Sequence, residues 1–140
     1  MKPATLESAG AIPLLQTLGI HPVEFGDGFA VMMVAVDQRH LNYFGGCHGG
    51  LIAALVDTVC FFSRELLPAG RLVTTNNLNI HYVRAASLDD VLTARSTLLH
   101  LGKRTASLRV DVTNQRAELV AHGSATLTVL KEPELESDIP

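Results

Sequence analysis

Residues 49–67 read GGLIAALVDTVCFFSRELL and form the one long segment whose apolar residues follow helical spacing. Two glycines open the segment, and Pro68-Ala69-Gly70 ends it. The apolar side chains go nearly all the way round the predicted helix: Leu51, Ile52, Leu55, Val56, Val59, Phe62 and Leu66. A helix that is apolar on every side is wrapped by other elements rather than laid on a surface. We therefore expect a strongly curled sheet, or a second subunit, to cover it.

The segments on either side of this helix are mostly strands. Before it come a short, weakly periodic helix over 5–19 and two strands, one of them the unbroken apolar run FAVMMVAV at 29–36, which indicates burial on both faces. After it, apolar and polar residues alternate over 77–84, 104–113 and 119–130, and less cleanly over 91–101. This order predicts an α+β fold, in which four consecutive hairpin-linked strands form an antiparallel sheet and the long helix crosses its concave face.

Composition points to one globular domain without a nucleic-acid partner. The chain has 140 residues, of which 47% are hydrophobic and 18% charged, as in a single folded domain with an aliphatic core. We assign residues 1–130 to this domain and 131–140 to an acidic, flexible C-terminal tail. The tail carries the whole net charge of −3, so the body is neutral and offers no basic stripe for a phosphate backbone.

Membrane and metal partners are not expected either. The apolar stretch from residue 9 to 20 is interrupted by Pro13 and Gln16 and is too short to span a bilayer. The two cysteines, Cys47 and Cys60, form no CxxC motif, and no histidine pair has helical ligand spacing. We therefore expect a cytoplasmic protein with no metal site.

Asp57 is the unusual residue of the predicted helix, because its neighbours in IAALVDTVCFF are nearly all apolar. A buried carboxylate is costly unless it is paired or hydrogen-bonded. Two interpretations are open. Asp57 is a structural residue that caps a neighbouring loop, or it is a general base or nucleophile in a cleft.

The loop before the helix, NYFGGCHGG at 42–50, has four glycines in six positions. Its unpaired N–H groups, together with the positive end of the helix dipole, form a site for an anionic oxygen and could stabilise the oxyanion of acyl transfer. The alternative is a tight turn without function.

Gly49 and Asp57 are too far apart to act on one carbonyl group within one chain. Eight positions along a helix correspond to ~12 Å, whereas an attacked carbonyl lies within ~3–4 Å of both its oxyanion donors and its base. If both residues act on the same carbonyl, they come from different subunits, with the two helices antiparallel. This hypothesis predicts that a monomer is inactive.

Gly49 and Asp57 belong to a first motif, N-x-x-G-x-x-H-G-G at 42–50 with Asp57 eight positions past Gly49. A second motif, T-x-x-L-N-I-x-Y, follows at 75–82. Together they resemble those of the hotdog-fold acyl-CoA thioesterases of the PaaI-like group, over about residues 10–130. The resemblance implies the hotdog fold, in which a curved antiparallel sheet wraps a central helix. It also implies assembly as homodimers or homotetramers, and hydrolysis of acyl-CoA without a metal or cofactor.

Carried over by position, the resemblance gives five residues a catalytic role. Asn42 and the backbone N–H of Gly49 would hold and polarise the thioester carbonyl, and His48 would support the loop and contact the thioester. Asp57 of the partner subunit would activate water or attack directly. Thr75 matches the Ser/Thr that helps to place the water. Because Thr74 stands beside it, the alignment with the family could shift by one position and move this role to Thr74.

Substrate contacts are expected from further residues. The acyl group would enter between subunits, against the long helix and the glycines before it, and the residues assigned to this contact are Gly50, Val56, Val59, Cys60 and Phe61. In similar enzymes basic residues near the turn at 102–104 contact the CoA phosphates, which makes Lys103 and Arg104 candidates; two solvated charges are the alternative. One departure from the family is Arg84-Ala85, where Arg-Pro is usual.

The sequence thus predicts an enzyme that hydrolyses an acyl-CoA, aryl or fatty acyl, to the free acid and CoA. Two alternatives stay open. One is a hotdog enoyl-CoA hydratase or dehydratase, with His48 and the partner's Asp57 poised on one carbon chain. The other is a non-catalytic acyl-CoA-binding protein of the same fold.

Overall fold

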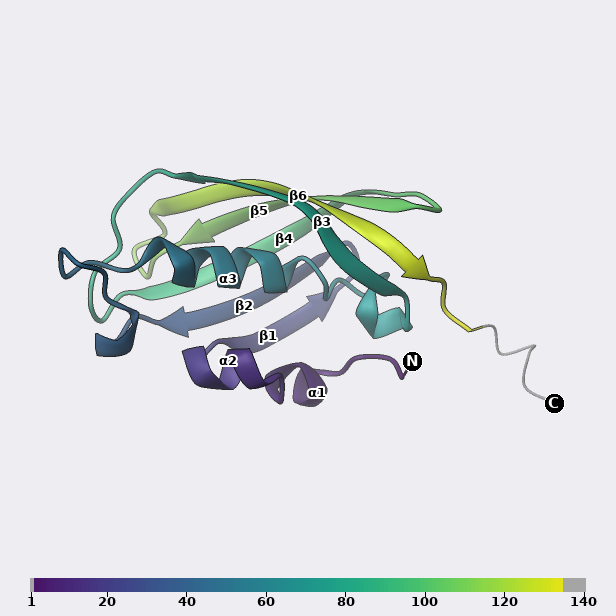
Figure 1. The fold of residues 1–140 in the computed structure, drawn as a ribbon, viewed down its shortest axis with the longest axis horizontal. Helices are drawn as coiled ribbons and strands as arrows, with labels where there is room; N and C mark the ends of the chain where they lie inside the picture. The colour runs from purple at the N-terminus through teal and green to yellow at the C-terminus, as the bar shows by residue number, and fades with distance from the viewer. Residues whose placement is uncertain (1, 135–140) are drawn as a thin grey trace.

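One curved antiparallel sheet of six strands packs against one side of the helix α3 (Figure 1). The structure is a computed structural model that describes residues 2–134. The strands lie in the order β1-β2-β4-β5-β6-β3. The elements are α1 Leu6–Gly10, α2 Pro13–Leu18, β1 His21–Gly26, β2 Phe29–Ala35, α3 Gly49–Val59, β3 Leu72–Tyr82, β4 Val91–Leu101, β5 Thr105–Thr113 and β6 Leu119–Lys131, with short 3-10 turns at Gln38–His40 and Leu67–Ala69. This is the predicted α+β hotdog architecture.

The pairing of β3 differs from the prediction. Hairpins join β4 to β5 and β5 to β6, but β3 pairs with β6 and so forms one edge of the sheet. The segment 83–90 carries the chain from this edge to β4, past two intervening strands, or ~14 Å at the usual strand spacing. The expected run of four hairpin-linked strands was therefore wrong at its first connection.

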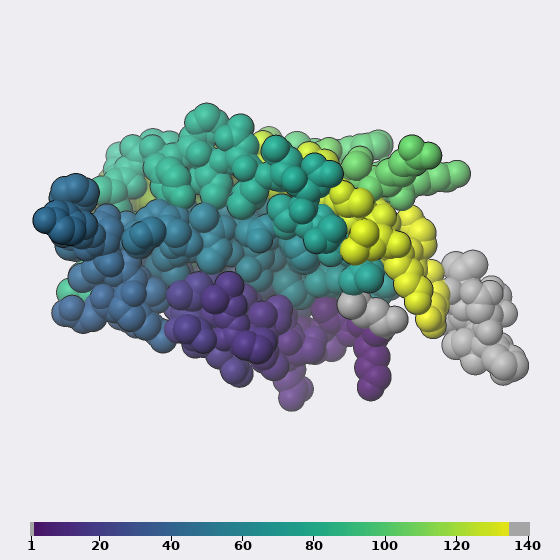
Figure 2. All heavy atoms as spheres, viewed as in Figure 1, coloured from purple at the N-terminus to yellow at the C-terminus, as the bar shows by residue number. Residues whose placement is uncertain are grey.

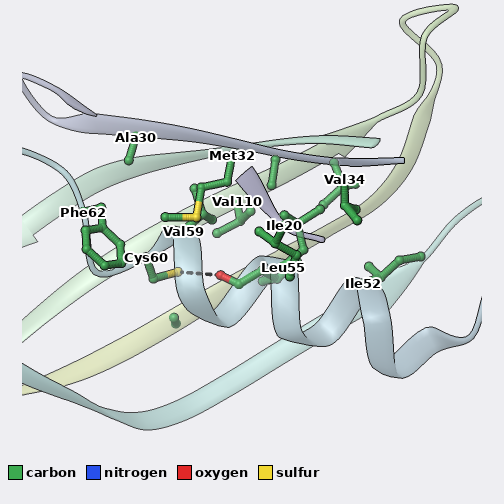
Figure 3. Packing of buried hydrophobic residues seen from close by; sticks show 14 of the residues in the cluster. Ile20, Ala30, Met32, Val34, Ile52, Leu55, Val59, Cys60, Phe62 and Val110 are labelled. Atoms are coloured by element: carbon green, nitrogen blue, oxygen red, sulfur yellow. Dashed lines mark hydrogen bonds between the residues drawn. The ribbon is translucent and has the colours of Figure 1, made fainter. Parts of the chain in front are cut away.

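The core lies between α3 and the concave face of the sheet. Leu55, Val56 and Val59 of α3 are fully buried, and they face Met32 of β2 and Val110 of β5 (Figure 3). The other side of α3 is only half-buried, at Ala53, Ala54, Asp57 and Thr58. Within one chain the sheet therefore covers the helix on one side, and the all-round cover expected from its composition is incomplete.

The helix α3 ends at Val59, eight positions before the end predicted at Leu67. The residues that follow bond to the β1–β2 turn instead: both Glu65 carboxylate oxygens accept from the Gly28 N–H, at 3.1 and 3.0 Å, and the Arg64 guanidinium pairs with Asp27 at 3.2 Å. The Phe62 ring stacks on Phe25 at 5.0 Å between centroids. These long-range contacts replace the helical hydrogen bonds that the local spacing predicts.

Two other elements differ from their predictions in detail. The expected helix over 5–19 is two helices, since Pro13 starts α2 after a break at 11–12. In β2 the residues Ala30, Met32 and Val34 are buried, but those between them are half-buried, so only one face of the strand is fully covered.

The C-terminal strand extends into the predicted tail. Lys131 is the last residue of β6, and Glu132 pairs with Arg71 at 2.9 Å. The rest of the predicted tail, from 135 to 140, lies outside the described residues. Over the range 2–134, no helix combines the length and the apolar character that crossing a membrane requires.

Candidate active site

The carboxylate of Asp57 is held by Thr75. Asp57 lies on the half-buried side of α3, near its C-terminal end, and its Oδ1 accepts a hydrogen bond of 2.6 Å from the Thr75 hydroxyl on β3. Thr74 points to the other face of the strand, because successive side chains alternate, and it is exposed. The structure therefore pairs Thr75, and not Thr74, with Asp57; the predicted role of Thr75 in placing the water stays a prediction.

Asp57 opens onto an apolar cavity of about 180 Å³ at the end of α3. The lining residues come from α2, from the end of α3 and from the segment that follows it: Ile12, Leu14, Leu15, Asp57, Thr58, Phe61, Phe62 and Leu67. Asp57 is the only ionisable residue among them. The wall thus presents one carboxylate, oriented by a hydroxyl, to a space suited to an apolar group.

At the opposite end of α3, Asn42 folds the loop that leads into the helix. Its amide oxygen accepts from the N–H groups of Phe44, at 2.9 Å, and Gly46, at 3.1 Å. Its amide nitrogen makes a single long contact, 3.4 Å to the Cys47 carbonyl. Gly45 occupies the left-handed region at φ 85°, which favours glycine at the tip of the turn. Asn42 therefore has a structural role through its oxygen, and its NH₂ group is left for a ligand.

His48 caps the helix. Its Nδ1 accepts a hydrogen bond of 2.7 Å from the Gly50 N–H, and its carbonyl accepts from the Leu51 N–H at 3.0 Å. The N–H of Gly49 comes one position before these two donors and has no acceptor in residues 2–134. The first turn of α3 therefore keeps one free donor at the positive end of its dipole, and this is the N–H to which the resemblance gives the role of oxyanion donor.

A larger cavity, about 540 Å³, lies beside this donor. It is lined by the first turn of α3 and by the chain after β3: Cys47, Gly49, Gly50, Ile52, Tyr82, Val83, Arg84, Ala85 and Ala86. The Tyr82 hydroxyl donates to the Gly49 carbonyl at 2.8 Å. A Cβ at position 49 would lie 3.2 Å from the Tyr82 ring. Glycine at this position thus permits the close approach of the ring.

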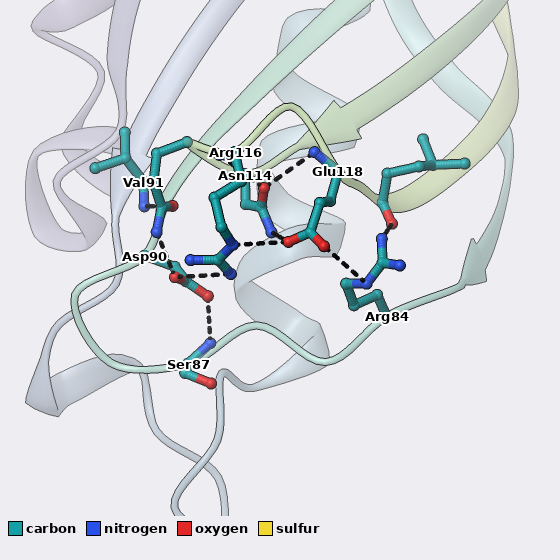
Figure 4. A network of polar contacts seen from close by, with 9 residues as sticks. Arg84, Ser87, Asp90, Val91, Asn114, Arg116 and Glu118 are labelled. Atoms are coloured by element: carbon teal, nitrogen blue, oxygen red, sulfur yellow. Dashed lines mark hydrogen bonds and ion pairs between the residues drawn. The ribbon is translucent and has the colours of Figure 1, made fainter.

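A polar network fixes the segment 83–86, which forms one wall of the larger cavity (Figure 4). Asp90 accepts hydrogen bonds from the Gln115 amide at 2.8 Å and the Ser87 N–H at 2.9 Å, and these bonds lower the pKa of its carboxyl. Glu118 accepts from Asn114 at 2.9 Å and Arg116 at 2.8 Å, and both bonds lower its pKa as well.

The same network reaches the glycine loop. Arg84 lies 3.8 Å from the Glu118 carboxylate and donates to the Leu119 carbonyl at 3.2 Å. The Ala86 carbonyl accepts from the Cys47 N–H at 2.9 Å. Cys47 is half-buried, and its burial, followed by the nearby Asp90 charge, raises its thiol pKa to about 11. The contacts of Arg84 and Ala86 hold the turn at 84–86, where Ala85 stands in place of the proline that is usual in the family.

Three of the predicted acyl-contacting residues lie in the core instead. Val56, Val59 and Cys60 are fully buried against the sheet, and the Cys60 thiol donates to the Val56 carbonyl at 3.2 Å. Burial, followed by the charge of Asp57, raises the Cys60 pKa to about 12. Of the four side chains assigned to the acyl group, only that of Phe61 lines the Asp57 cavity.

Of the remaining predicted contacts, Gly50 lines the larger cavity, whereas the two basic residues lie apart from both cavities. Lys103 and Arg104 are exposed in the turn between β4 and β5 and line neither of them. Residues of α2 and the segment 82–86 line the cavities but were not predicted. Only Tyr82 had a signal, as the last residue of the second motif, whereas nothing in the sequence of α2 marks it as a wall.

Gly49 and Asp57 lie near opposite ends of one continuous helix, so a single chain does not bring the free N–H to the carboxylate. The two cavities are likewise lined by different residues. Two regions of the chain, called half-sites below, therefore carry the candidate groups: a free backbone N–H beside a large cavity, and a hydrogen-bonded carboxylate beside a small apolar one.

Known proteins share this sequence and fold. The model of the thioesterase superfamily matches residues 44–121. The acyl-coenzyme A thioesterase PaaI of Escherichia coli K12 is 31% identical over 106 residues, which cover 76% of this chain and 74% of that protein. The solved structure of E. coli PaaI superimposes with a TM-score of 0.81 at 26% identity, covering 88% of each chain. A Streptococcus mutans UA159 protein solved with acetyl-CoA bound has a TM-score of 0.74 at 28% identity, covering 82% of this chain and 91% of that one.

The family match covers more than half of the chain, and the relative in E. coli is similar over three quarters of it. The chain therefore belongs to the thioesterase superfamily, in its PaaI-like group of hotdog-fold enzymes.

Proposed function

We propose that this protein hydrolyses an acyl-CoA to the free acid and CoA at a site shared between two subunits. The observation that carries the proposal is the Asp57 carboxylate, oriented by Thr75 on the wall of an apolar cavity. The thioester class follows from the family. The CoA part is supported by the name of the E. coli relative and by the acetyl-CoA bound to the S. mutans protein.

A second subunit is supported by the edges of the sheet. Edge strands are usually protected by charged residues, proline or bulges. The edge strand β1 contains Pro22 and an irregular register beside it. The other edge, β3, has an irregular register between Thr75 and Asn77 but pairs regularly with β6 over residues 77–82, which contain no proline, Lys, Arg, Asp or Glu. This bare edge is suited to pairing with a second copy of itself.

Such a pairing would join the two half-sites. Along β3, Thr75 contacts Asp57 and Tyr82 contacts Gly49, so β3 runs antiparallel to α3. If β3 pairs antiparallel with its copy about residues 78 and 79, Tyr82 of one chain comes beside Thr75 of the other. The free N–H of Gly49 then lies at the partner's Asp57. The smallest active unit is a homodimer, and a homotetramer would contain two such pairs.

Chemistry at this site needs only the groups described. The Gly49 N–H and the Asn42 NH₂ group polarise the thioester carbonyl. The partner's Asp57 takes a proton from water, whose oxygen forms a bond to the carbonyl carbon, and the negative charge that develops on the carbonyl oxygen is held at the helix N-terminus. The C–S bond then breaks, the acid leaves, and the CoA sulfur receives the proton from the Asp57 carboxyl.

A direct attack by Asp57 uses the same carboxylate. Its oxygen forms an anhydride with the acyl group, the CoA sulfur leaves, and water cleaves the anhydride. Single turnover in ¹⁸O-water identifies the anhydride route when water attacks the aspartyl carbon, because general-base attack leaves the Asp57 side chain unlabelled. Label enters the Asp57 side chain only if water cleaves the anhydride at the aspartyl carbon.

The 540 Å³ cavity beside Gly49, with Arg84 on its wall, is the proposed approach for the CoA arm. Lys103 and Arg104 remain candidates for the CoA phosphates. They lie at the Asp57 end of the molecule, because Thr128 of β6 pairs with both Thr74 and Thr105. In a shared site they would come from the subunit that supplies Asp57.

The test is thiol release from a panel of acyl-CoAs by the wild type and by Asp57→Asn, which keeps the size of the side chain and removes the base. We expect release by the wild type and a loss of at least about 100-fold in the variant. Undiminished release by Asp57→Asn would refute the mechanism. Loss of enoyl absorbance from crotonyl-CoA without thiol release would replace the proposal by a hydratase, and binding without either reaction would replace it by an acyl-CoA-binding protein.

A further inference from the structure

Two aromatic side chains stand almost free in solvent at the tip of the glycine loop. Tyr43 is 96% exposed and Phe44 is 90% exposed, and their rings contact each other edge to face at 5.4 Å between centroids. Figure 2 shows the loop as the dark-blue projection at one end of the molecule. Large aromatic side chains on a projecting loop are typical of contacts with another molecule.

The loop is held in shape although its tip is bare. The Asn42 side chain bonds to the N–H groups of Phe44 and Gly46, and the Asn42 N–H bonds to the Gly46 carbonyl at 2.8 Å. The aromatic pair is thus presented by a preformed turn, which lowers the entropic cost of docking.

A complementary apolar surface lies at the other end of α3. The cavity beside Asp57 is open, with Leu14 of α2 55% exposed on its rim and Phe61 half-buried on its wall. Its lining contains no charge other than that of Asp57. Within one chain the aromatic pair cannot reach this surface, because α3 separates the two.

The antiparallel arrangement proposed above removes this separation. The loop continues past the N-terminus of α3, and the cavity continues past its C-terminus. When Gly49 of one chain lies at the partner's Asp57, Tyr43 and Phe44 therefore extend over the partner's α2 and the segment after its α3. Both exposed apolar surfaces are then covered by one two-fold contact.

We infer that Tyr43 and Phe44 of each subunit dock on the apolar surface formed by Leu14 and Phe61 of the other and close its Asp57 cavity. The aromatic pair then forms the outer wall of the acyl chamber. The occupant of the surface is a second copy of this chain, and the inference rests on the shared site proposed above. The cavity measures about 180 Å³ while it is open, so an aromatic wall across its mouth favours compact acyl groups over long chains.

Cross-linking tests the contact directly. Phe44→Cys and Leu14→Cys are combined in a Cys47→Ser background, which removes the half-buried thiol of the same loop, and the protein is oxidised mildly. We expect a covalent dimer on a non-reducing gel. The matched control combines Phe44→Cys with Leu99→Cys, since Leu99 is 56% exposed and lines neither cavity. No covalent dimer from the first pair, or equal yields from both pairs, would overturn the contact.

Substrate selectivity tests the wall. Phe44→Ala should raise the ratio of kcat/KM for long over short acyl-CoAs by about tenfold, the effect of one or two methylene groups gaining room. Leu99→Ala should leave this ratio unchanged. An unchanged ratio in Phe44→Ala would remove the aromatic pair from the acyl chamber.

The proposed hydrolysis and the proposed docking contact can be refuted independently of each other. Cross-linking requires no turnover, so a covalent dimer that releases no thiol would refute the hydrolase and keep the docking contact. A protein that releases thiol but yields no specific cross-link would do the reverse.

Discussion

Replacing Thr75 by valine removes the hydrogen bond to Asp57 without changing the shape of the side chain. The bond is short, 2.6 Å, and its acceptor is a carboxylate. Hydrogen bonds to charged groups are worth about 1.5–3 kcal/mol, and the half-buried position of both residues places this one at the lower end, about 1.5–2 kcal/mol. If the bond serves to aim the carboxylate in the transition state, its loss lowers kcat by about 10- to 30-fold.

The assay is thiol release at saturating and limiting acyl-CoA. Thr75 lines neither cavity, so we expect kcat to fall while KM stays within about twofold. Thr75→Ser keeps the hydroxyl and should retain most of the activity. A Thr75→Val enzyme with wild-type kcat would show that Asp57 needs no orientation by β3. Equal losses in both variants would attribute the effect to packing instead.

Two further predictions concern Asn42 and Asp90. Asn42→Asp keeps the oxygen that folds the loop but loses the NH₂ donor, so thiol release should fall by about 100-fold with unchanged circular dichroism; normal release would remove Asn42 from the oxyanion site. The folded-state pKa of Asp90 lies below its unfolded value, chiefly through the Gln115 hydrogen bond. Its contribution to stability is therefore present above the unfolded pKa, about 3.9, and is lost as the pH falls through the folded pKa. Asp90→Asn should lower Tm at pH 7 but not in strong acid, and an equal loss at both pH values would contradict this.

The last three strands were predicted closely. Alternation sets the limits and the buried face of 104–113 and 119–130, and the turn at Gly102-Lys103 ends 91–101, where alternation is less clean. The prediction of 91–101 matches β4, and those of 104–113 and 119–130 miss by one residue at one end. The partner of β3 could not be predicted in this way. Alternation gives a strand its two faces but does not say which strand it pairs with, and here the connection at 83–90 decides this.

The limits of α3 depended on contacts that a local pattern does not contain. Glu65 and Arg64 bond to the β1–β2 turn, nearly forty positions earlier, and this ends the helix. The same limitation explains the acyl contacts. Helical spacing placed the apolar residues Val56 and Val59 in the helix, but it did not show that their side of the helix faces the sheet.

The short motifs singled out Asp57, Thr75 and His48, and the helix or strand beside each residue fixes where it lies. The catalytic roles given to these residues stay predictions. Residues such as Leu14 were missed because α2 reaches the cavity only through the tertiary fold. The outward-facing Tyr43 and Phe44 stood inside the first motif, but their exposure was visible only once the loop had its shape.

The bare edge of β3 has a consequence for the newly synthesised chain. If β3 pairs as proposed, a protomer that has folded before it meets its copy displays a row of unpaired backbone groups over residues 77–82, which contain no Lys, Arg, Asp or Glu, and such a row accepts strands from other unfolded chains. Slow assembly therefore favours aggregation during expression. Slower synthesis in the cell should therefore raise the recovery of intact protein. Refolding in vitro should likewise recover more protein when the concentration is high enough for rapid pairing of the protomers.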